Sequence, residues 1–438
     1  MSLNQQPLFV FDSILGDYAE LEKKYKFSYD DSRFEATPVN FKLSKTIARH
    51  RWFTYKEGFS PIFIREFIEN YNIKNTNCVI FDPFGGIGTT VLESSNMGYL
   101  AMSNDVNPLS NYIARIKTEN YSENFLAQLL EERHEFIKSE LIESLDPPKN
   151  DTVIKYFDPK TLQALLKIQY WTMSRKEEKV RNIFHLIFLT SLESLSTHRK
   201  DGNGVKLKKN FQSLVDIEEI KKLFLDRLEI IIEDLQNTPN PKISPIISYQ
   251  SSFERYKLPV KADLVITSPP YANCFDYSKI YLVELWMGSF FKTKEDQQIF
   301  RESSVQSHVH YTWKRDQSNF DNQLIEKIMD YLDEQKLWNK KIPSMLNGYF
   351  FDLKKVLKEL INHLNTGAVL GFVVGNSVYA GLPIATDLIL ANIAEELGYV
   401  VKEIKVYRKL TASSQQMKKL GNDEQQYLRE SLVVLEWK

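Results

Sequence analysis

The chain has 438 residues, a formal net charge of −1, 43% hydrophobic residues and 26% charged residues. This composition is that of an ordinary globular protein with a substantial core, and the charge gives no global argument for nucleic acid, so a phosphate-binding surface has to be local. Two cysteines are too few for a disulfide framework or a zinc site. The first residues lack a signal-peptide pattern and no apolar run reaches ~20 residues, so we expect a cytoplasmic protein without a membrane partner.

The N-terminal part leads into an α/β unit. Residues 1–45 mix polar and aromatic side chains without a clear period, and we expect an irregular arm. From Ser60 onward, apolar residues recur at helical spacing, which predicts a helix. An apolar run at 78–81 predicts a buried strand, and a glycine turn, a helix near 89–97 and a second strand at 99–103 follow it.

The rest of the chain alternates insertions with strands. Helical spacing dominates 121–238, and a second insertion at about 286–345 is rich in Lys, Asp, Gln, His and Trp. Further strands are predicted at 243–249, 262–266, 368–374, 401–407 and 431–437, with a helix at 384–397. The pattern predicts the α/β class, with a mostly parallel seven-stranded sheet that ends in an antiparallel hairpin.

The glycine turn Gly85-Gly86-Ile87-Gly88 indicates a nucleoside cofactor. Glycines let the backbone turn sharply and approach a ligand, and the helix that follows offers free N–H groups. Asp82 precedes the turn, where a carboxylate suits the cationic amine of a methionine moiety, and Phe84 can line the adenosine side. Asp105, after the second strand, is placed to accept from ribose hydroxyls. An NAD site uses similar glycines and a similar acid, so those two features alone do not discriminate.

The segment Ser268-Pro269-Pro270-Tyr271 follows the strand at 262–266 and suits an exocyclic amino group. Two prolines hold the backbone extended and leave its carbonyls without local partners. The Ser268 hydroxyl and the Pro269 carbonyl can then accept from one NH₂ group, which frees the nitrogen lone pair to attack a methyl donor. Tyr271 offers a ring for base stacking, and a loop without function is the alternative reading of such a segment.

Three segments resemble the amino-methyltransferase family of DNA methyltransferases, which modify N4 of cytosine or N6 of adenine. They are Asp82-Pro83-Phe84-Gly85-Gly86-Ile87-Gly88-Thr89-Thr90, Thr267-Ser268-Pro269-Pro270-Tyr271 and Arg51-Trp52-Phe53-Thr54-Tyr55-Lys56-Glu57-Gly58-Phe59-Ser60-Pro61. The resemblance implies a Rossmann-like methyltransferase fold, S-adenosyl-L-methionine as cofactor and a target base that is flipped out of double-stranded DNA. It also allows a cognate restriction endonuclease as a second partner. We expect no metal, because this methyl-transfer chemistry does not need one.

The resemblance implies roles for two groups of residues. The expected cofactor-binding residues are Tyr55, Phe59, Asp82, Pro83, Phe84, Gly85, Gly86, Gly88, Thr89 and Asp105. The expected catalytic residues are Ser268, Pro269, Pro270 and Tyr271. Serine at the first position of the target segment is more typical of the cytosine-N4 branch, whereas adenine enzymes more often carry Asp or Asn there.

We divide the chain accordingly. Residues 1–120 form the N-terminal arm and the cofactor-binding half of the catalytic domain, 121–240 a mainly helical insertion, and 241–438 the target-base half with its insertion at about 286–345. Many cytosine-N4 enzymes have the two motifs in the reverse order, so either insertion, or both, can be the region that reads DNA.

One local basic stretch is the best candidate for phosphate contact. Five basic residues surround a Gly-Asn-Gly turn: Arg199, Lys200, Lys206, Lys208 and Lys209. The alternative is a solvated loop without a role in binding. In the second insertion, His308, His310 and Trp313 are candidates for neighbours of the base, with a structural role as the alternative.

Three other functions fit parts of this pattern. An RNA methyltransferase acting on guanine N2 of a tRNA shares the amine chemistry. A catalytically silent DNA-binding subunit shares the fold. A nicotinamide oxidoreductase shares the glycine turn but leaves Pro269 and Pro270 unexplained.

Overall fold

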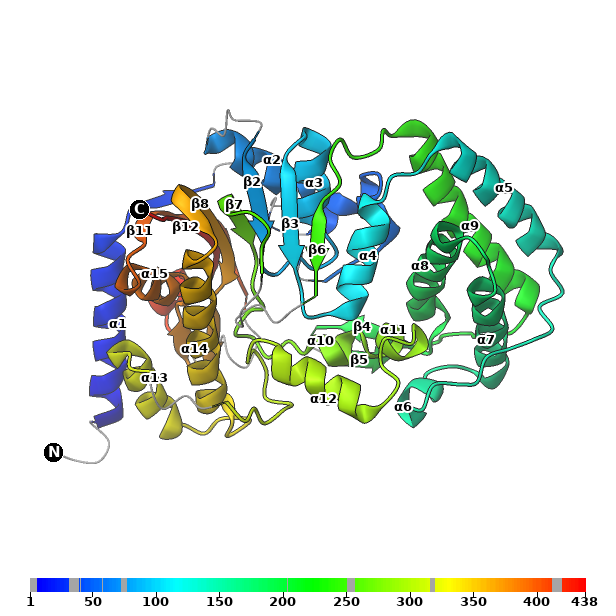
Figure 1. The fold of residues 1–438 in the computed structure, drawn as a ribbon. Helices are drawn as coiled ribbons and strands as arrows, with labels where there is room; N and C mark the ends of the chain where they lie inside the picture. The colour runs from blue at the N-terminus through cyan, green and yellow to red at the C-terminus, as the bar shows by residue number, and fades with distance from the viewer. Residues whose placement is uncertain are drawn as a thin grey trace.

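The computed structural model describes most of the chain. The described residues are 6–30, 39, 41–56, 58–71, 77–202, 204–249, 257–315, 320–411 and 420–438. In Figure 1 a twisted sheet stands in the middle, with helices on its two faces and a further body of helices at one side.

The sheet orders its strands in a way that brings distant segments together. Its eight strands, among the described residues, are β1 (Phe27–Tyr29), β2 (Val79–Asp82), β3 (Leu100–Asn104), β6 (Ile246–Ser248), β7 (Ala262–Thr267), β8 (Leu364–Gly375), β11 (Val400–Lys409) and β12 (Arg429–Glu436). They lie side by side in the order β1-β11-β12-β8-β7-β2-β3-β6. The strands from β6 to β8 are parallel, β12 is antiparallel to both its neighbours, and β1 is parallel to β11.

The chain reverses its direction of travel across the sheet between β2 and β7. From β2 it passes outward to β3 and β6, then returns to the other side of β2 through β7 and β8. Ligands of open α/β sheets bind at the carboxyl ends of the strands where the order reverses. The glycine turn follows β2 and the Ser-Pro-Pro-Tyr segment follows β7, so both emerge at this switch point.

Helices cover both faces of the sheet, which explains the nearly continuous apolar runs of the central strands. Phe81 and Val265 face one core, whereas Ile80 and Leu264 face the other. The first core is completed by α1 (Gln6–Lys24), α13 (Gln323–Asp333), α14 (Ile342–Ile361) and α15 (Thr386–Glu396). The second is completed mainly by α2 (Pro61–Asn70), which packs on α3 (Thr89–Met97).

A third core lies in the body of helices between β3 and β6. Its helices are α4 (Pro108–Thr118), α5 (Glu123–Lys138), α6 (Asp151–Ile154), α7 (Pro159–Met173), α8 (Glu178–Leu195) and α9 (Ile217–Asn237). A two-stranded antiparallel hairpin, β4 (His198–Asp201) and β5 (Gly204–Leu207), separates α8 from α9. After β7, the helices α10 (Tyr277–Ile280) and α11 (Leu282–Met287) join the same core, and α12 (Lys294–Ser303) follows.

Shorter elements complete the described chain. They are the 3₁₀ helices η1 (Phe41–Thr46), η2 (His50–Trp52) and η3 (Glu424–Tyr427), and the small hairpin of β9 (Ser377–Tyr379) and β10 (Leu382–Ile384). The segment joining η2 to α2 lies against the sheet end where the glycine turn emerges, because Tyr55 lines the same pocket as Gly86.

The prediction of an irregular arm at 1–45 is wrong. Residues Gln6–Lys24 form a helix whose side chains Ile14 and Tyr18 are fully buried. Tyr18 donates its hydroxyl hydrogen to the carbonyl of Pro383, 3.1 Å away. The arm also supplies β1, so the sheet has eight strands in the described chain instead of the expected seven. Within the rest of the predicted arm, residues 31–38 and residue 40 lie outside the described residues.

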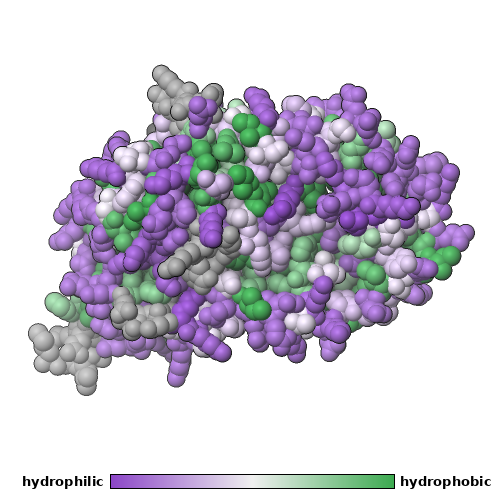
Figure 2. Space-filling view, in the orientation of Figure 1, coloured by the Kyte–Doolittle hydropathy of each residue, from purple (hydrophilic) through white to green (hydrophobic). Residues whose placement is uncertain are grey.

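The surface shows where the molecule is polar. On the face drawn in Figure 2, hydrophilic residues cover the helices at both ends of the molecule, and hydrophobic residues gather over the middle strands. None of the helices in the described part of the chain combines the length and apolar character needed to cross a lipid bilayer.

Replacing Gly371 with alanine tests the packing of α2 on the sheet. A Cβ at Gly371 would lie 2.4 Å from a ring carbon of the buried Phe67, so the substitution overpacks this core and should destabilise the fold by about 1–3 kcal/mol. Gly16→Ala is the matched control, because a Cβ there meets nothing within 4 Å and lies in a helix, where alanine stabilises by about 0.5–1 kcal/mol. Urea denaturation of both variants measures the difference. Equal stability of the two variants would contradict the described packing.

Candidate active site

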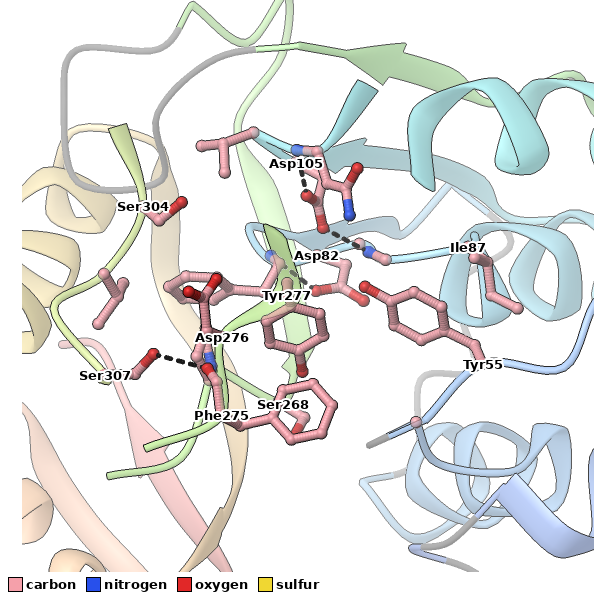
Figure 3. A pocket seen from close by; sticks show the side chains of 18 of the residues that line it. Tyr55, Asp82, Ile87, Asp105, Ser268, Phe275, Asp276, Tyr277, Ser304 and Ser307 are labelled. Atoms are coloured by element: carbon pink, nitrogen blue, oxygen red, sulfur yellow. Dashed lines mark hydrogen bonds between the residues drawn. The ribbon is translucent and has the colours of Figure 1, made fainter. Parts of the chain in front are cut away.

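One pocket at the switch point contains residues of both sequence motifs. The empty space in and around it is about 890 Å³, part of which is open solvent. Figure 3 shows the close approach, with Asp105 at one end, Ser268 and Phe275 at the other, and Asp82 and Tyr277 between them. The pocket is lined by these expected residues: Tyr55, Phe59, Asp82, Phe84, Gly85, Gly86, Thr89, Asp105, Ser268 and Pro270.

Asp82 ties the two halves of the pocket together. Its carboxylate accepts from the hydroxyl of Thr267, at the end of β7, and from that of Thr90, at the start of α3, each at 2.6 Å. The N–H of Phe84 donates to the same carboxylate at 3.0 Å. Burial raises the pKa of Asp82 to about 6, although these three donors work in the opposite direction.

Asp105 holds the glycine turn in place. Its carboxylate accepts from the backbone N–H groups of Gly86, at 2.8 Å, and of Asn107, at 2.7 Å. Burial raises the pKa of Asp105 to about 6 against the effect of those two donors. The carboxylate still lines the pocket, so it meets any ligand there as well as the turn.

The glycines of the turn leave no room for side chains. A Cβ at Gly85 would lie 2.6 Å from the Cβ of Ser103, and one at Gly88 would lie 2.8 Å from the Cβ of Ala114. Gly88 also adopts φ +80°, which favours glycine. These contacts with β3 and α4 explain why the sequence has glycine at both positions.

A buried lysine supports the turn from behind, and sequence reasoning did not find it. Lys117 is fully buried in α4, and its ammonium group donates to the carbonyl of Ile87 at 3.0 Å. Burial lowers the pKa of Lys117 to about 7. A lysine near the end of a helix resembles a surface residue in sequence, so nothing local marks it.

Aromatic rings form one wall of the pocket. Tyr55 stacks on Tyr281, with ring centroids 5.0 Å apart, and lies 5.9 Å from Tyr277. Phe275 contacts Tyr277 edge to face at 4.7 Å. Phe275 and Tyr277 line the pocket beside Ser268 and belong to the same loop after β7. Their closeness to the Ser-Pro-Pro-Tyr segment in the sequence is the signal that could have identified them.

Four expected site residues are not among those that line the pocket. They are Pro83, Gly88, Pro269 and Tyr271. The hydroxyl of Tyr271 donates to Glu430 on β12 at 2.8 Å, and its ring lies where a Cβ at Gly375 would be. Ser268 Oγ lies 3.5 Å from that hydroxyl. Tyr271 thus connects the segment to the sheet, and the aromatic residues of this loop that line the pocket are Phe275 and Tyr277.

The second half of the pocket carries a polar cluster around Asp276. Asp276 and His308 both line the pocket, and both are buried. Asp276 forms an ion pair with Arg301 at 2.9 Å, and the imidazoles of His308 and His310 lie 3.6 and 3.8 Å from its oxygens. Burial works to raise the pKa of Asp276, but its cationic and hydrogen-bonding neighbours outweigh burial and lower it.

The five basic candidates form two groups: Lys200 and Lys208 bond to other parts of the protein, whereas Arg199, Lys206 and Lys209 are exposed. Lys200 forms a close ion pair with the buried Glu284, and its ammonium lies 4.5 Å from the ring centroid of Tyr281. Lys208 donates to three carbonyls at the end of α8. The side chains of Arg199 and Lys206 are 62% and 69% exposed.

The outward group of the hairpin is partly neutralised. Asp201 lies 2.9 Å from Lys206 and 3.9 Å from Arg199. Lys209 is also exposed, and Asn203 in the turn lies outside the described residues. Three of the five basic residues, Arg199, Lys206 and Lys209, are therefore available at the surface.

The chain is similar over most of its length to proteins named as type II methyltransferases. It is 26% identical to M.AvaI of Nostoc sp., covering 90% of this chain and 88% of that protein. It is 27% identical to M.BsoBI of Geobacillus stearothermophilus, covering 95% and 91%, and 23% identical to M.MvaI of Kocuria varians, covering 88% and 90%. No family model matches the chain.

Solved structures resemble the chain only weakly. The rRNA methyltransferase AviRa of Streptomyces viridochromogenes gives a TM-score of 0.31 at 9% identity, covering 92% of this chain and 94% of that one. TrmN of Thermus thermophilus gives 0.29 at 8%, covering 86% and 49%. The type II methyltransferase relatives, which match nearly end to end, are the stronger comparison.

Thr267→Val tests the bond that joins the two halves of the site. Valine keeps the shape of threonine but cannot donate to the buried Asp82, so we expect a loss of about 1–3 kcal/mol in stability. Thr172→Val is the matched control, because the buried Thr172 donates only to the carbonyl of Ile168 within its own helix. Urea denaturation compares the two. A smaller loss for Thr267→Val than for the control would contradict the role given to this bond.

Proposed function

We propose that the protein is a site-specific DNA methyltransferase that transfers a methyl group from S-adenosyl-L-methionine to the exocyclic amino group of a flipped base, with cytosine N4 favoured over adenine N6. The single observation that carries the proposal is the shared pocket, in which the glycine turn and Asp105 meet Ser268 and Pro270. The end-to-end similarity to type II methyltransferases supports a DNA methyltransferase family.

S-adenosyl-L-methionine is the methyl donor, and the residues of the pocket fit it. The pocket is lined by the buried carboxylate of Asp82 and the half-buried carboxylate of Asp105, which suit a ligand with a cationic amine and ribose hydroxyls. Gly86, at φ +49°, presents bare backbone to the pocket opposite the ring of Tyr55. When bound, the cofactor supplies an electrophilic methyl group.

The residues after β7 position the target amine. The Ser268 hydroxyl lines the pocket and can accept from the amine, while the rings of Phe275 and Tyr277 offer faces against which a flat base can stack. The amine nitrogen bonds to the methyl carbon as the methyl–sulfur bond breaks and leaves a neutral thioether, and the nitrogen then loses one proton to solvent. Holding the amine in line with the methyl group accounts for most of the rate enhancement. No covalent intermediate with the protein and no metal enters this scheme.

The preference for cytosine rests on Ser268, because serine at this position is more typical of the cytosine-N4 branch. The pocket can hold only a base that has left the helical stack, since the amine of a paired base is occupied. The predicted cytoplasmic location and the cognate endonuclease remain predictions.

The experiment that tests the function identifies the methylated base. DNA from a host without modification enzymes is incubated with the protein and cofactor carrying a deuterated methyl group, and the nucleosides are analysed by mass spectrometry. We expect labelled N4-methylcytosine. Labelled N6-methyladenine would reverse the base preference, and label in a parallel tRNA sample but not in DNA would contradict the proposal.

Ser268→Ala tests the amine-positioning role. Loss of one acceptor that orients the reacting amine should lower the rate of methyl transfer roughly 100-fold or more, the scale seen when one preorganised hydrogen bond is removed. Cofactor affinity by calorimetry should stay unchanged. The control Ser174→Ala alters an exposed serine at the end of α7 and should behave like the wild type. Wild-type turnover in Ser268→Ala would remove Ser268 from the site.

The β4–β5 hairpin is the proposed phosphate-binding element. Lys200 anchors it to Tyr281, which stacks on Tyr55 of the pocket wall, so the exposed basic residues lie on an element joined to the site. This placement favours 121–240 as a region that contacts DNA. Asp201 weakens the positive charge, so the contribution of each residue should be modest.

Replacing Arg199, Lys206 and Lys209 together with glutamine tests this surface. Each lost phosphate contact should reduce the slope of log binding constant against log salt by about 0.9. DNA binding is measured by fluorescence anisotropy at several salt concentrations, and cofactor binding serves as a fold check. The matched control replaces the exposed Lys138, Lys160 and Lys176 of the helical body. An unchanged slope in the hairpin variant would exclude phosphate contact there.

A further inference from the structure

The pocket wall opposite the glycine turn contains a buried imidazole that the chemistry above leaves unused. His308 is 4% exposed and lines the pocket with Asp276. Its segment, which follows α12, is held against the loop after β7, because the N–H of Cys274 donates to the carbonyl of Ser307 at 3.0 Å. His308 therefore stands on the side of the pocket that Ser268 also lines.

The hydrogen bonds of His308 assign its proton. Its Nδ1 accepts from the backbone N–H of His310 at 3.3 Å, so that nitrogen carries a lone pair. Burial lowers the pKa of His308 to about 4, and the ring is neutral at physiological pH. The remaining proton is then on Nε2, whose nearest acidic neighbour is Asp276 Oδ1 at 3.6 Å. That distance is beyond an ordinary hydrogen bond, so Asp276 Oδ1 does not accept a hydrogen bond from Nε2–H in this geometry.

The neighbours of His308 keep this arrangement fixed. Asp276 accepts from the Ser278 hydroxyl at 2.6 Å and from Arg301 at 2.9 Å, and Arg301 also donates to Ser278 at 2.8 Å. The imidazole packs against Trp313 with ring centroids 4.8 Å apart. The protonated nitrogen of the imidazole lies on the side of Asp276, and both residues line the pocket.

A metal ion is the alternative occupant of this cluster, since ligand atoms of Asp276, His308 and His310 lie within 4.8 Å of one another. Two observations argue against it. The guanidinium of Arg301 already supplies the positive charge at Asp276, and the Nδ1 lone pair of His308 is engaged by a backbone N–H. A cation would have to displace the guanidinium of Arg301 and could use only the Nε2 atom of His308.

We propose that His308 is a specificity-determining residue whose Nε2–H donates to the ring nitrogen beside the reacting amine, which is N3 of cytosine or N1 of adenine. This inference rests on the proposed function. Cytosine and adenine share the required feature, because the carbon that carries the amine is bonded to an unprotonated ring nitrogen. Ser268 accepts a hydrogen bond from the amine of the base, and His308 donates one to the neighbouring ring nitrogen. The two residues together therefore recognise a base that carries a donor next to an acceptor. Asp276 and Arg301 act through His308 as positioning residues.

The test uses a duplex oligonucleotide that carries the target site once mass spectrometry and sequencing have located it. A second duplex replaces the target base by its deaza analogue, 3-deazacytosine or 1-deazaadenine, in which carbon replaces the ring nitrogen. His308→Leu removes the donor with a side chain of similar size, and His308→Gln retains an N–H near the position of Nε2. Cofactor binding by calorimetry verifies that each variant is folded.

We expect His308→Leu to lower kcat/KM on the natural duplex about ten- to a hundredfold, the scale of one hydrogen bond. On the deaza duplex it should match the wild type, and His308→Gln should restore much of the preference for the natural base. An equal loss on both duplexes, a loss of cofactor binding in proportion, or activity that a chelator abolishes would overturn the assignment. If the wild type methylates no duplex DNA, the proposed function fails and His308 loses its role with it.

Discussion

The structure depends on one buried carboxylate that is shared across the switch point of the sheet. Asp82 ends β2, Thr267 ends β7 and Thr90 lies in the first turn of α3, and the hydroxyls of both threonines donate to the carboxylate of Asp82 at 2.6 Å. The strands that carry the two motifs are far apart in the chain but adjacent in the sheet. An unpaired buried carboxylate is costly, so this bond fixes the ends of the strands relative to each other as well as stabilising the core.

The parts of the fold that sequence could predict are those with local causes. The strand at 78–81, the helix at 89–97 and the strand at 262–266 each agree with the structure within one or two residues, because buried strands and glycine turns have distinct local patterns. The helix at Gln6–Lys24 was missed although Ile14 and Tyr18 lie one turn apart. Its apolar face packs against elements that lie hundreds of residues later, so no neighbouring segment indicated that it was buried.

The candidate site divides in the same way. The places of Asp105 and Ser268 in the pocket could be predicted, because both residues directly follow strands whose ends are marked in the sequence by turn residues. The orientation of the Tyr271 side chain could not be predicted, because it depends on a hydrogen bond to Glu430 on β12, far away in the sequence. The inward bonds of Lys200 and Lys208 likewise depend on Glu284 and on the end of α8, so a count of basic residues overstated the charged surface. Long-range partners, rather than residue type, determine these cases.

The position of α1 has a consequence for synthesis of the protein. The helix packs on α13 and α15, and Tyr18 is fully buried against residues such as Pro383 and Tyr427. A nascent chain emerging from a ribosome exposes this apolar face until α13 and α15 have also been made. The helix is thus translated long before the elements that bury it, and a translation product interrupted between them would display it as a surface that chaperones bind or that aggregates.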